Sequence, residues 1–286
     1  MNELFGYEGK KVVINGAASG MGEAATRLLV DLGAEIYALD IKEVKLPVKK
    51  YIYTDLSKKE SIDAALVEIP GNVDRVFTCA GVPGPPFTPI QTVMVNFVGN
   101  RYMVEALLPR VVDGGAVSMI SSIAGQGWQA VLKVLDQFIA ITDFEQSRAW
   151  LEAHSEVLRS ESRDWIDAHP GETSPSQDAA PYAFSKQCLV AYVKSRAWEL
   201  ATRKIRINTL SPGDTATPMM TAFHAAYTKE GIDMMVTPID RYASPQEMGG
   251  PLVFLNSDMA SYISGLDMVV DFGFTATAEL RAIRGG

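Results

Sequence analysis

Tyr182 and Lys186 lie four residues apart and are the two side chains of this sequence best suited to move a proton together. On a helix this spacing places both on one face, so an ammonium group can lie beside a phenol and favour its ionised form. Because a free tyrosine titrates at about 10, that shift would bring the phenol closer to neutral pH, where proton transfer is most efficient. Tyr7 and Lys11 share the spacing in a glycine-rich stretch, so an ordinary amphipathic helix explains the pair equally well.

A glycine-rich turn at residues 15–22, NGAASGMG, follows a predicted strand at 11–14 and opens a predicted helix at 21–32. Backbone amides at such a turn can face a pyrophosphate, and the absent side chains allow close approach, although a plain tight turn is the alternative. Asp40 follows a second predicted strand at 35–39. Its carboxylate could accept hydrogen bonds from an adenosine ribose and would repel a 2′-phosphate, whereas the alternative is a strand-end acid in solvent.

The composition of the 286 residues limits the classes of partner. Hydrophobic residues make up 47% and charged residues 21%, which is typical of a globular protein without membrane-spanning segments. A net charge of −8 without a basic run argues against nucleic acid and anionic membranes as partners, and is compatible with a small-molecule substrate. Three histidines without metal spacing give no support for a metal site. With two cysteines and no secretory signal at the N-terminus, we expect a cytoplasmic location.

Apolar runs of strand type alternate with helical patterns along the chain. Further strands are predicted at 73–78, 116–120, 205–210 and 266–270, and a third strand is expected to end at Asp55-Leu56. The alternation predicts an α/β fold, a Rossmann-type doubly wound parallel sheet. At 286 residues the chain could form two domains by average size, but α/β folds of this length are often single, and we expect a single domain spanning residues 1–286. Only a short crossover helix fits between Asp55 and Val73.

A segment from about 128 to 179 is predicted to be helical and precedes the helix of Tyr182. Its apolar side chains form two stripes, one at Val131, Leu132, Leu135, Phe138 and Ile139, and one at Phe144, Leu151, Leu158 and Trp165. Such stripes must be buried against another surface.

Six motifs follow one another in a set order: Gly16-x3-Gly20-x-Gly22, Cys79-Ala80-Gly81, Asn96, Ser122, Tyr182-x3-Lys186 and Pro212-Gly213. In these motifs the chain resembles the short-chain dehydrogenases/reductases over nearly its whole length. It is most similar to the bacterial 3α-hydroxysteroid dehydrogenase/carbonyl reductases, which also carry a helical insert before the tyrosine. The resemblance implies a Rossmann-type oxidoreductase that uses NAD(H).

The resemblance also implies roles for single residues. Tyr182 would donate the proton, Lys186 would assist it and hold the nicotinamide ribose, and Ser122 would hold the substrate oxygen, while Ser121 packs away from it. Asn96 would lie within a helix and hold a water that relays protons, the alternative being a solvated helix residue. Cofactor contacts are expected from Gly16, Ala18, Ser19, Gly20, Met21, Gly22, Asp40, Asp55, Leu56, Ala80, Gly81, Tyr182, Lys186, Pro212, Gly213, Thr215 and Thr217.

Two of these assignments carry further detail. Thr215 and Thr217 match residues that hold the nicotinamide amide and the phosphates. Asp55-Leu56 could approach the adenine, but an Asp-Leu-Ser sequence is equally a common helix cap.

Three positions depart from the family pattern. Asn15 stands in place of the usual threonine, Thr78-Cys79 in place of two asparagines, and Phe272 interrupts the usual glycine pair after Asp271. The segment between Ser122 and Tyr182 is also longer than usual. None of these changes removes a reacting group, but together they weaken the transfer of substrate by analogy.

We therefore expect an enzyme that interconverts a secondary alcohol and a ketone, on a hydrophobic cyclic substrate such as a steroid or an aromatic ketone. The segment that usually covers the substrate is rich in flexible apolar side chains, which favours this class, although they could equally be core residues of a small helix: Met219, Met220, Phe223, Tyr227, Met234 and Met235. A smaller polar alcohol is the alternative substrate, and a non-catalytic dinucleotide-binding regulator is the alternative function. We also expect a homo-oligomer, with a dimer favoured over a tetramer, because the insert precedes a helix that commonly lies at the subunit contact in this family.

Overall fold

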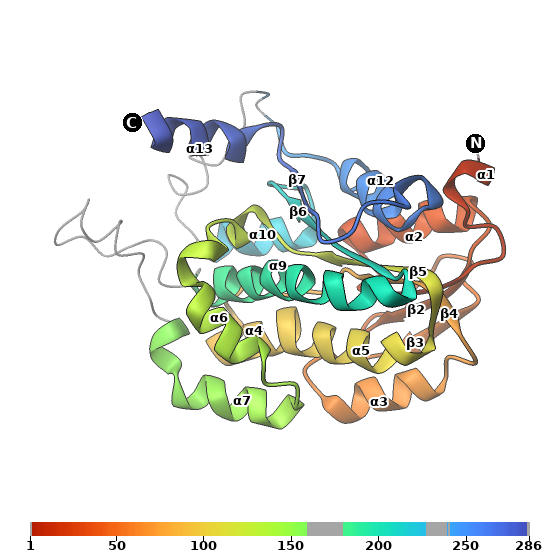
Figure 1. Ribbon diagram of the computed structural model, residues 1–286, viewed down its shortest axis with the longest axis horizontal. Helices are drawn as coiled ribbons and strands as arrows, with labels where there is room; N and C mark the ends of the chain where they lie inside the picture. Colours follow the sequence, from red (N-terminus) through yellow and green to blue (C-terminus); the bar gives the residue numbers. More distant parts are fainter. Residues whose placement is uncertain (1, 159–179, 227–238, 240, 285–286) are drawn as a thin grey trace.

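The computed structural model describes residues 2–158, 180–226, 239 and 241–284 (Figure 1). Its strands are β1 (Lys11–Asn15), β2 (Glu35–Asp40), β3 (Lys50–Tyr53), β4 (Val73–Thr78), β5 (Val111–Ile120), β6 (Arg206–Pro212) and β7 (Asp267–Val270). Its α-helices are α1 (Asn2–Phe5), α2 (Gly20–Asp31), α3 (Lys59–Val67), α4 (Pro89–Val93), α5 (Asn100–Leu107), α6 (Leu132–Ile139), α7 (Phe144–Ala153), α9 (Ala180–Leu200), α10 (Pro218–Ala226), α12 (Pro245–Asn256) and α13 (Phe274–Arg284). A π-helical stretch, η1 (Met94–Gly99), joins α4 to α5, and short 3-10 turns are η2 (Leu108–Arg110), η3 (Ile123–Gly125), η4 (Trp128–Val131), η5 (Ser155–Leu158), η6 (Ala201–Arg203) and η7 (Asp258–Ala260).

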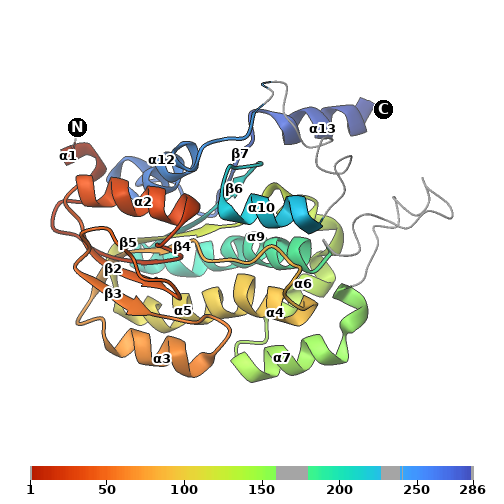
Figure 2. The same ribbon diagram turned by 180° about the vertical axis from the view of Figure 1, so that it is seen from behind.

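The described strands form one parallel sheet in the order β3-β2-β1-β4-β5-β6-β7. Successive residues of a strand point to opposite faces, so each strand contributes to two cores. Val13 belongs to the core under α3, α5 and α9, whereas Val12 and Ile14 belong to the core under α2 and α12. Figures 1 and 2 show these helices as two layers with the sheet between them. The predicted doubly wound α/β fold is confirmed.

The element boundaries differ from the predicted ones at a few places. The third strand ends at Tyr53 and not at Asp55-Leu56, because the chain leaves the sheet as soon as it has paired with Asp40. Helix α3 is short, as expected. The Tyr7 and Lys11 pair does not lie on a helix, because Tyr7 is buried with its hydroxyl on the Val253 carbonyl and Lys11 begins β1.

The segment predicted to be helical from 128 onward contains η4, α6, α7 and η5 up to Leu158, and residues 159–179 with Trp165 lie outside the described part. Phe144, Leu151 and Leu158 are buried as the second stripe predicts. In the first stripe Leu135 and Phe138 are buried, but Val131 and Leu132 are more than one third exposed, so this part of the prediction is wrong. Val131 ends η4 and Leu132 begins α6, whereas the buried side chains Leu135 and Phe138 lie further along α6.

The buried stripes are covered by the same chain. The Phe138 ring lies 5.7 Å from Phe97 of η1, 5.6 Å from Phe184 of α9 and 4.9 Å from Trp150 of α7, measured between ring centroids. The buried Arg101 guanidinium donates to the Ile139 carbonyl and to the Ser147 hydroxyl, which ties α5 to the connection between α6 and α7. Helices α6 and α7 therefore belong to the core of the protein.

Replacing Phe138 with Ala should lower the free energy of unfolding by about 3–5 kcal/mol, because the fully buried ring leaves a cavity between α6, η1 and α9. Leu132→Ala in the same helix is the matched control and should cost under about 1 kcal/mol, since Leu132 is 37% exposed. Urea denaturation of both variants measures the difference. Equal effects would mean that α6 is not part of the cooperative core.

Candidate active site

An open groove of about 730 Å³ runs along the carboxyl ends of β1, β2 and β4. In a doubly wound sheet this edge, where the strand order reverses, is where ligands bind. Of the residues predicted to contact the cofactor, those lining the groove are Gly16, Ser19, Gly20, Met21, Gly22, Asp40, Asp55, Leu56, Ala80, Gly81 and Thr217. The predicted site residues that do not line it are Ala18, Asn96, Ser122, Tyr182, Lys186, Pro212, Gly213 and Thr215.

The glycine turn forms one wall of the groove out of backbone alone. Gly16 has a φ of +67°, and a Cβ there would lie 2.4 Å from the Ala80 nitrogen. A Cβ on Gly22 would lie 2.1 Å from the Gly16 carbonyl oxygen, so neither glycine tolerates a side chain. The first turn of α2, with Gly20 and Met21, also lines the groove, and a helix N-terminus is suited to a phosphate. These features fit a dinucleotide better than a plain tight turn.

Asp40 ends β2 at the groove and is held by two backbone amides. Its Oδ2 accepts from the Ala18 nitrogen at 2.9 Å and its Oδ1 from the Lys42 nitrogen at 2.9 Å. The carboxylate is therefore fixed to the glycine turn and is not a free strand-end acid in solvent. A carboxylate that accepts hydrogen bonds from ribose hydroxyls needs this kind of fixed orientation.

Asp55 and Leu56 line the same groove, just after the end of β3. The Asp55 carboxylate accepts from the Ser57 nitrogen and hydroxyl and pairs with Lys58. Lys58 is the N-cap residue of α3, so the Asp-Leu-Ser sequence closes a turn before the helix and does not cap it.

Tyr182 and Lys186 lie on α9, where it packs against η3 and the end of β5. The Lys186 Nζ lies 5.3 Å from the centroid of the Tyr182 ring and donates to the Ile120 carbonyl at 3.1 Å. Ser122 begins η3 two residues after Ile120 and is 8% exposed, with its hydroxyl accepting from the Ala124 amide at 3.1 Å. The structure thus brings Lys186 to Tyr182 and to Ile120, two residues before Ser122 in the chain.

Burial controls the charge of Lys186. The side chain is 3% exposed, and loss of solvation lowers the pKa of its ammonium group to about 8. The Ser121 hydroxyl is buried and donates to the Lys186 carbonyl at 2.9 Å, and its packing away from a substrate oxygen stays a prediction.

Asn96 lies in the π-helical stretch η1 and is fully buried, which excludes a solvated helix residue. Its Oδ1 accepts from the Val82 nitrogen at 2.7 Å, and its Nδ2 donates to the Val82 carbonyl and to the Ser185 hydroxyl. The side chain therefore holds the loop after β4 against α9. Its expected role toward a proton-relaying water stays a prediction.

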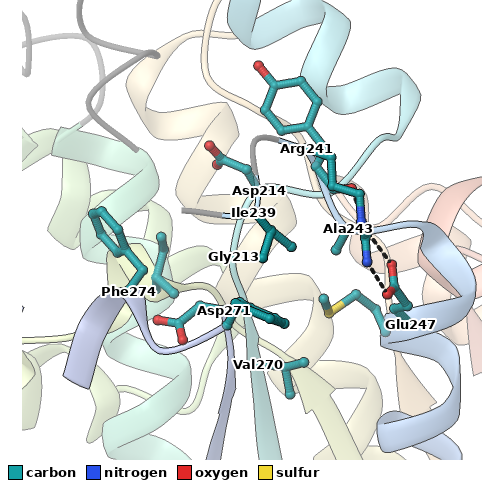
Figure 3. Close-up of a pocket in the computed structure, with 13 residues that line it drawn as sticks. Gly213, Asp214, Ile239, Arg241, Ala243, Glu247, Val270, Asp271 and Phe274 are labelled. Carbon is teal, nitrogen blue, oxygen red and sulfur yellow. Dashed lines mark hydrogen bonds and ion pairs between the residues drawn. The ribbon is translucent and has the colours of Figure 1, made fainter. Parts of the chain in front are cut away.

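Pro212 ends β6, and Gly213, the next residue, lines a second, smaller pocket, shown in Figure 3. A Cβ on Gly213 would lie 2.9 Å from the Asp271 Cβ, so close packing between β6 and β7 explains this glycine without a ligand. Ile123, the residue after Ser122, lines the same pocket. The Arg241 and Glu247 ion pair closes another side of it.

Thr215 is buried, and its hydroxyl donates to the Gly213 carbonyl at 2.9 Å, whereas Thr217 lines the main groove. On α10, Met219 also lines the groove, and the Phe223 ring lies edge-on to the Tyr182 ring with centroids 5.2 Å apart. Tyr227, Met234 and Met235 lie outside the described residues.

Sequence reasoning missed two buried residues of this region. Asn100 follows Asn96 by one helical turn and bonds to Asn15, and Ser185 donates to the Tyr182 carbonyl. The available signal for Asn100 was a second asparagine one helical turn after Asn96.

In the part of the chain that the structure describes, His, Cys, Asp and Glu side chains form no group of three able to hold a metal ion. Among the described helices, none combines the length and apolar character needed to cross a membrane.

Comparisons with known proteins agree with this geometry. Residues 10–134 match the family model described as short chain dehydrogenase, and residues 169–275 match the one described as enoyl-(acyl carrier protein) reductase. The 3-alpha-hydroxysteroid dehydrogenase/carbonyl reductase of Comamonas testosteroni is 31% identical over 273 residues, which cover 93% of this chain and 96% of that protein. The coniferyl-alcohol dehydrogenase of Pseudomonas sp. strain HR199 is 27% identical over 270 residues, which cover 94% of this chain and 97% of that protein.

A solved structure extends the likeness to three dimensions. The 3-alpha-hydroxysteroid dehydrogenase of Pseudomonas sp. B-0831, complexed with NADH, aligns with a TM-score of 0.76 at 25% identity, over 95% of this chain and 99% of that one. With the glycine turn, the buried lysine beside its tyrosine and these matches along nearly its whole length, the chain belongs to the short-chain dehydrogenases/reductases.

Proposed function

We propose that this protein is an NAD(H)-dependent oxidoreductase that interconverts a secondary alcohol and a ketone, with Tyr182 as the acid and base. The observation that carries the proposal is the buried Lys186 ammonium group, 5.3 Å from the centroid of the Tyr182 ring at the end of β5. The names of the relatives support it, since they include a hydroxysteroid dehydrogenase and an alcohol dehydrogenase, and the matched solved structure contains NADH.

The residues divide the work of ketone reduction. Bound NADH would supply the hydride that adds to the carbonyl carbon. The Tyr182 hydroxyl would donate its proton to the carbonyl oxygen, and the Lys186 charge would stabilise the phenolate that forms. Ser122 would hold the carbonyl oxygen by a hydrogen bond. At Gly16 and Gly22 the backbone would approach the cofactor closely, and the Asp40 carboxylate would accept hydrogen bonds from its ribose hydroxyls.

For the substrate we propose a hydrophobic cyclic ketone, such as a steroid or an aromatic ketone. Phe223 against the Tyr182 ring and Met219 in the groove support this class, because both present apolar surface close to the reacting groups. A smaller polar alcohol is the second candidate, and a non-catalytic dinucleotide-binding regulator is the third. Ser122, Tyr182 and Lys186 argue against the regulator because all three reacting groups are present.

The proposal includes a cytoplasmic homodimer. The buried stripe of α6 is already covered by η1 and α9 of the same chain, so it gives no support for a subunit contact. The dimer therefore rests on the family resemblance.

Tyr182→Phe should abolish turnover of a ketone panel with NADH while the Kd for NADH changes little, because the ring keeps its packing and only the transferable proton is lost. Tyr262→Phe is the control, since Tyr262 is fully exposed, and it should keep full activity. NADH oxidation followed by identification of the alcohol gives the rate and the substrate class. Near-normal kcat in Tyr182→Phe, or no alcohol from any ketone with the unsubstituted protein, would refute the assignment.

Asp40 should make kcat/KM at least about tenfold higher with NADH than with NADPH, because the fixed carboxylate gains ribose hydrogen bonds and repels a 2′-phosphate. Asp40→Asn should narrow that ratio by removing the charge. Asp31→Asn, at an exposed acid at the end of α2, is the control and should leave the ratio unchanged. Equal values for both cofactors in the unsubstituted protein would contradict the cofactor assignment.

The lowered pKa of Lys186 predicts how stability depends on pH. An unfolded lysine titrates at about 10.4, so between pH 8 and that value the unfolded chain binds more protons and stability rises with pH. Below pH 8 the cost of the buried charge is fully present. Lys186→Met removes the titrating group, so this contribution to the pH dependence disappears.

From pH 7 to pH 9.5 the unsubstituted protein should therefore gain about 2 kcal/mol of unfolding free energy relative to Lys186→Met, with no turnover in the variant. Lys194→Met replaces an exposed lysine of the same helix and is the control: relative to this variant, the unsubstituted protein should gain no such stability over the same pH range. Urea denaturation across this pH range measures both. A difference between the unsubstituted protein and Lys186→Met that does not change with pH would show that Lys186 titrates near its usual value.

A further inference from the structure

Asn15 and Asn100 form a buried side-chain pair beneath the cofactor groove. The Asn15 Nδ2 donates to the Asn100 Oδ1 at 2.7 Å, and the two side chains are 1% and 2% exposed. The Asn15 Oδ1 accepts from the Cys79 and Ala80 nitrogens, both at 2.8 Å. Asn15 therefore joins the glycine turn at the end of β1 to the end of β4.

Asn100 extends this link into the helix that follows. Its Nδ2 lies within hydrogen-bond distance of the Ala80 carbonyl at 3.0 Å and of the Val95 and Asn96 carbonyls at 3.1 Å. Val95 and Asn96 belong to η1, Asn100 begins α5, and Ala80 follows β4, so the Asn100 amide holds the π-helical stretch against the Cys79-Ala80 turn. A π-helical stretch of this kind leaves main-chain carbonyls without their regular partners, and a side-chain donor can satisfy them.

From Asn96 the hydrogen bonds continue to the helix of Tyr182. Asn96 donates to the Ser185 hydroxyl at 3.2 Å, and Ser185 donates to the Tyr182 carbonyl at 2.6 Å. Both Asn96 and Ser185 are fully buried. The series of hydrogen bonds thus runs from the turn that would hold the cofactor, through the Asn96 main-chain carbonyl and then the Asn96 side chain, to the backbone of the proposed acid.

We propose that Asn15 and Asn100 are positioning residues, which hold the cofactor side of the groove in register with the Tyr182 helix. This inference rests on the proposed function, since it needs a cofactor and an acid to align. An amide suits the position because it both donates and accepts and carries no charge at any working pH. A hydroxyl, the shorter group usual in the family at position 15, also donates and accepts, but it does so from a single atom closer to the backbone, so it reaches less far toward Asn100.

A purely structural role is the competing explanation, because any buried asparagine stabilises a fold. Asn208 provides the comparison within this chain. It is also fully buried, donates to the Ile263 carbonyl and accepts from the Leu266 nitrogen, but it lies within β6 and outside the groove. Loss of either kind of asparagine should lower stability, whereas only loss of the Asn15 and Asn100 pair should lower affinity for NADH.

The experiment is a double-mutant cycle on the Kd for NADH, measured by titration calorimetry with the folded full-length protein. Asn15→Ala and Asn100→Ala should each weaken NADH binding about tenfold, and the double variant should be no more than about twofold weaker than the worse single variant, because both break the same link. The kcat for a reduced ketone should fall in the same variants, and Asn208→Ala should stay within about twofold in Kd. If an alanine variant fails to fold, Asn15→Ser and Asn100→Ser replace it, since neither serine can bridge the gap between the two side chains.

The outcomes separate the two proposals. Effects on Kd that multiply in the double variant, or a Kd that is unchanged while stability falls as in Asn208→Ala, overturn the positioning role and leave the proposed function standing. Failure of the unsubstituted protein to bind NADH overturns the proposed function, and the positioning role with it.

Discussion

The burial of the Lys186 ammonium group at the end of β5 is the constraint on which the rest of the candidate site depends. Burying a charged side chain that is only 3% exposed is costly, and here the ammonium group donates a hydrogen bond to the Ile120 carbonyl. The Ser121 hydroxyl holds the Lys186 backbone in turn, so helix and strand end are fixed to each other from both sides. The arrangement is unfavourable for stability alone, which is typical of a group kept for chemistry.

The other half of the site is built from backbone and not from charge. A parallel sheet brings the ends of β1, β2 and β4 to one edge, and the glycine turn then approaches Cys79 and Ala80 too closely for any side chain at Gly16 or Gly22. Asp40 is tied to the same turn through the Ala18 amide. A ligand in this groove would contact backbone groups and a carboxylate whose positions are already fixed, which lowers the conformational cost of binding.

Local spacing in the sequence predicted the glycine turn and the pairing of Tyr182 with Lys186, because each depends on one turn or one helix. The groove residues Ala80, Gly81 and Thr217 were predicted from the family resemblance. Local spacing did not predict the link between Asn15 and Asn100, since these residues are separated by 85 positions and meet only when β1 lies beside β4. Likewise, the motif at Gly213 suggested a ligand contact, whereas packing against Asp271 accounts for the glycine. Apolar periodicity identified α6 and α7 but placed Val131 and Leu132 inside, because periodicity does not reveal where a helix first touches its neighbours.

The packing of α6 connects that helical segment to the chemistry without any contact to a substrate. Phe138 touches Phe97, the residue after Asn96, and Phe184, which lies between Tyr182 and Lys186 on α9. Phe138 therefore packs against both η1 and α9, the two elements that are also joined by the 3.2 Å hydrogen bond from Asn96 to Ser185. Because interiors are close-packed, a change of volume at Phe138 must be absorbed by movement of η1 or α9. The segment that lengthens this chain between Ser122 and Tyr182 thus packs against two elements of the site, although none of its described side chains lines the groove.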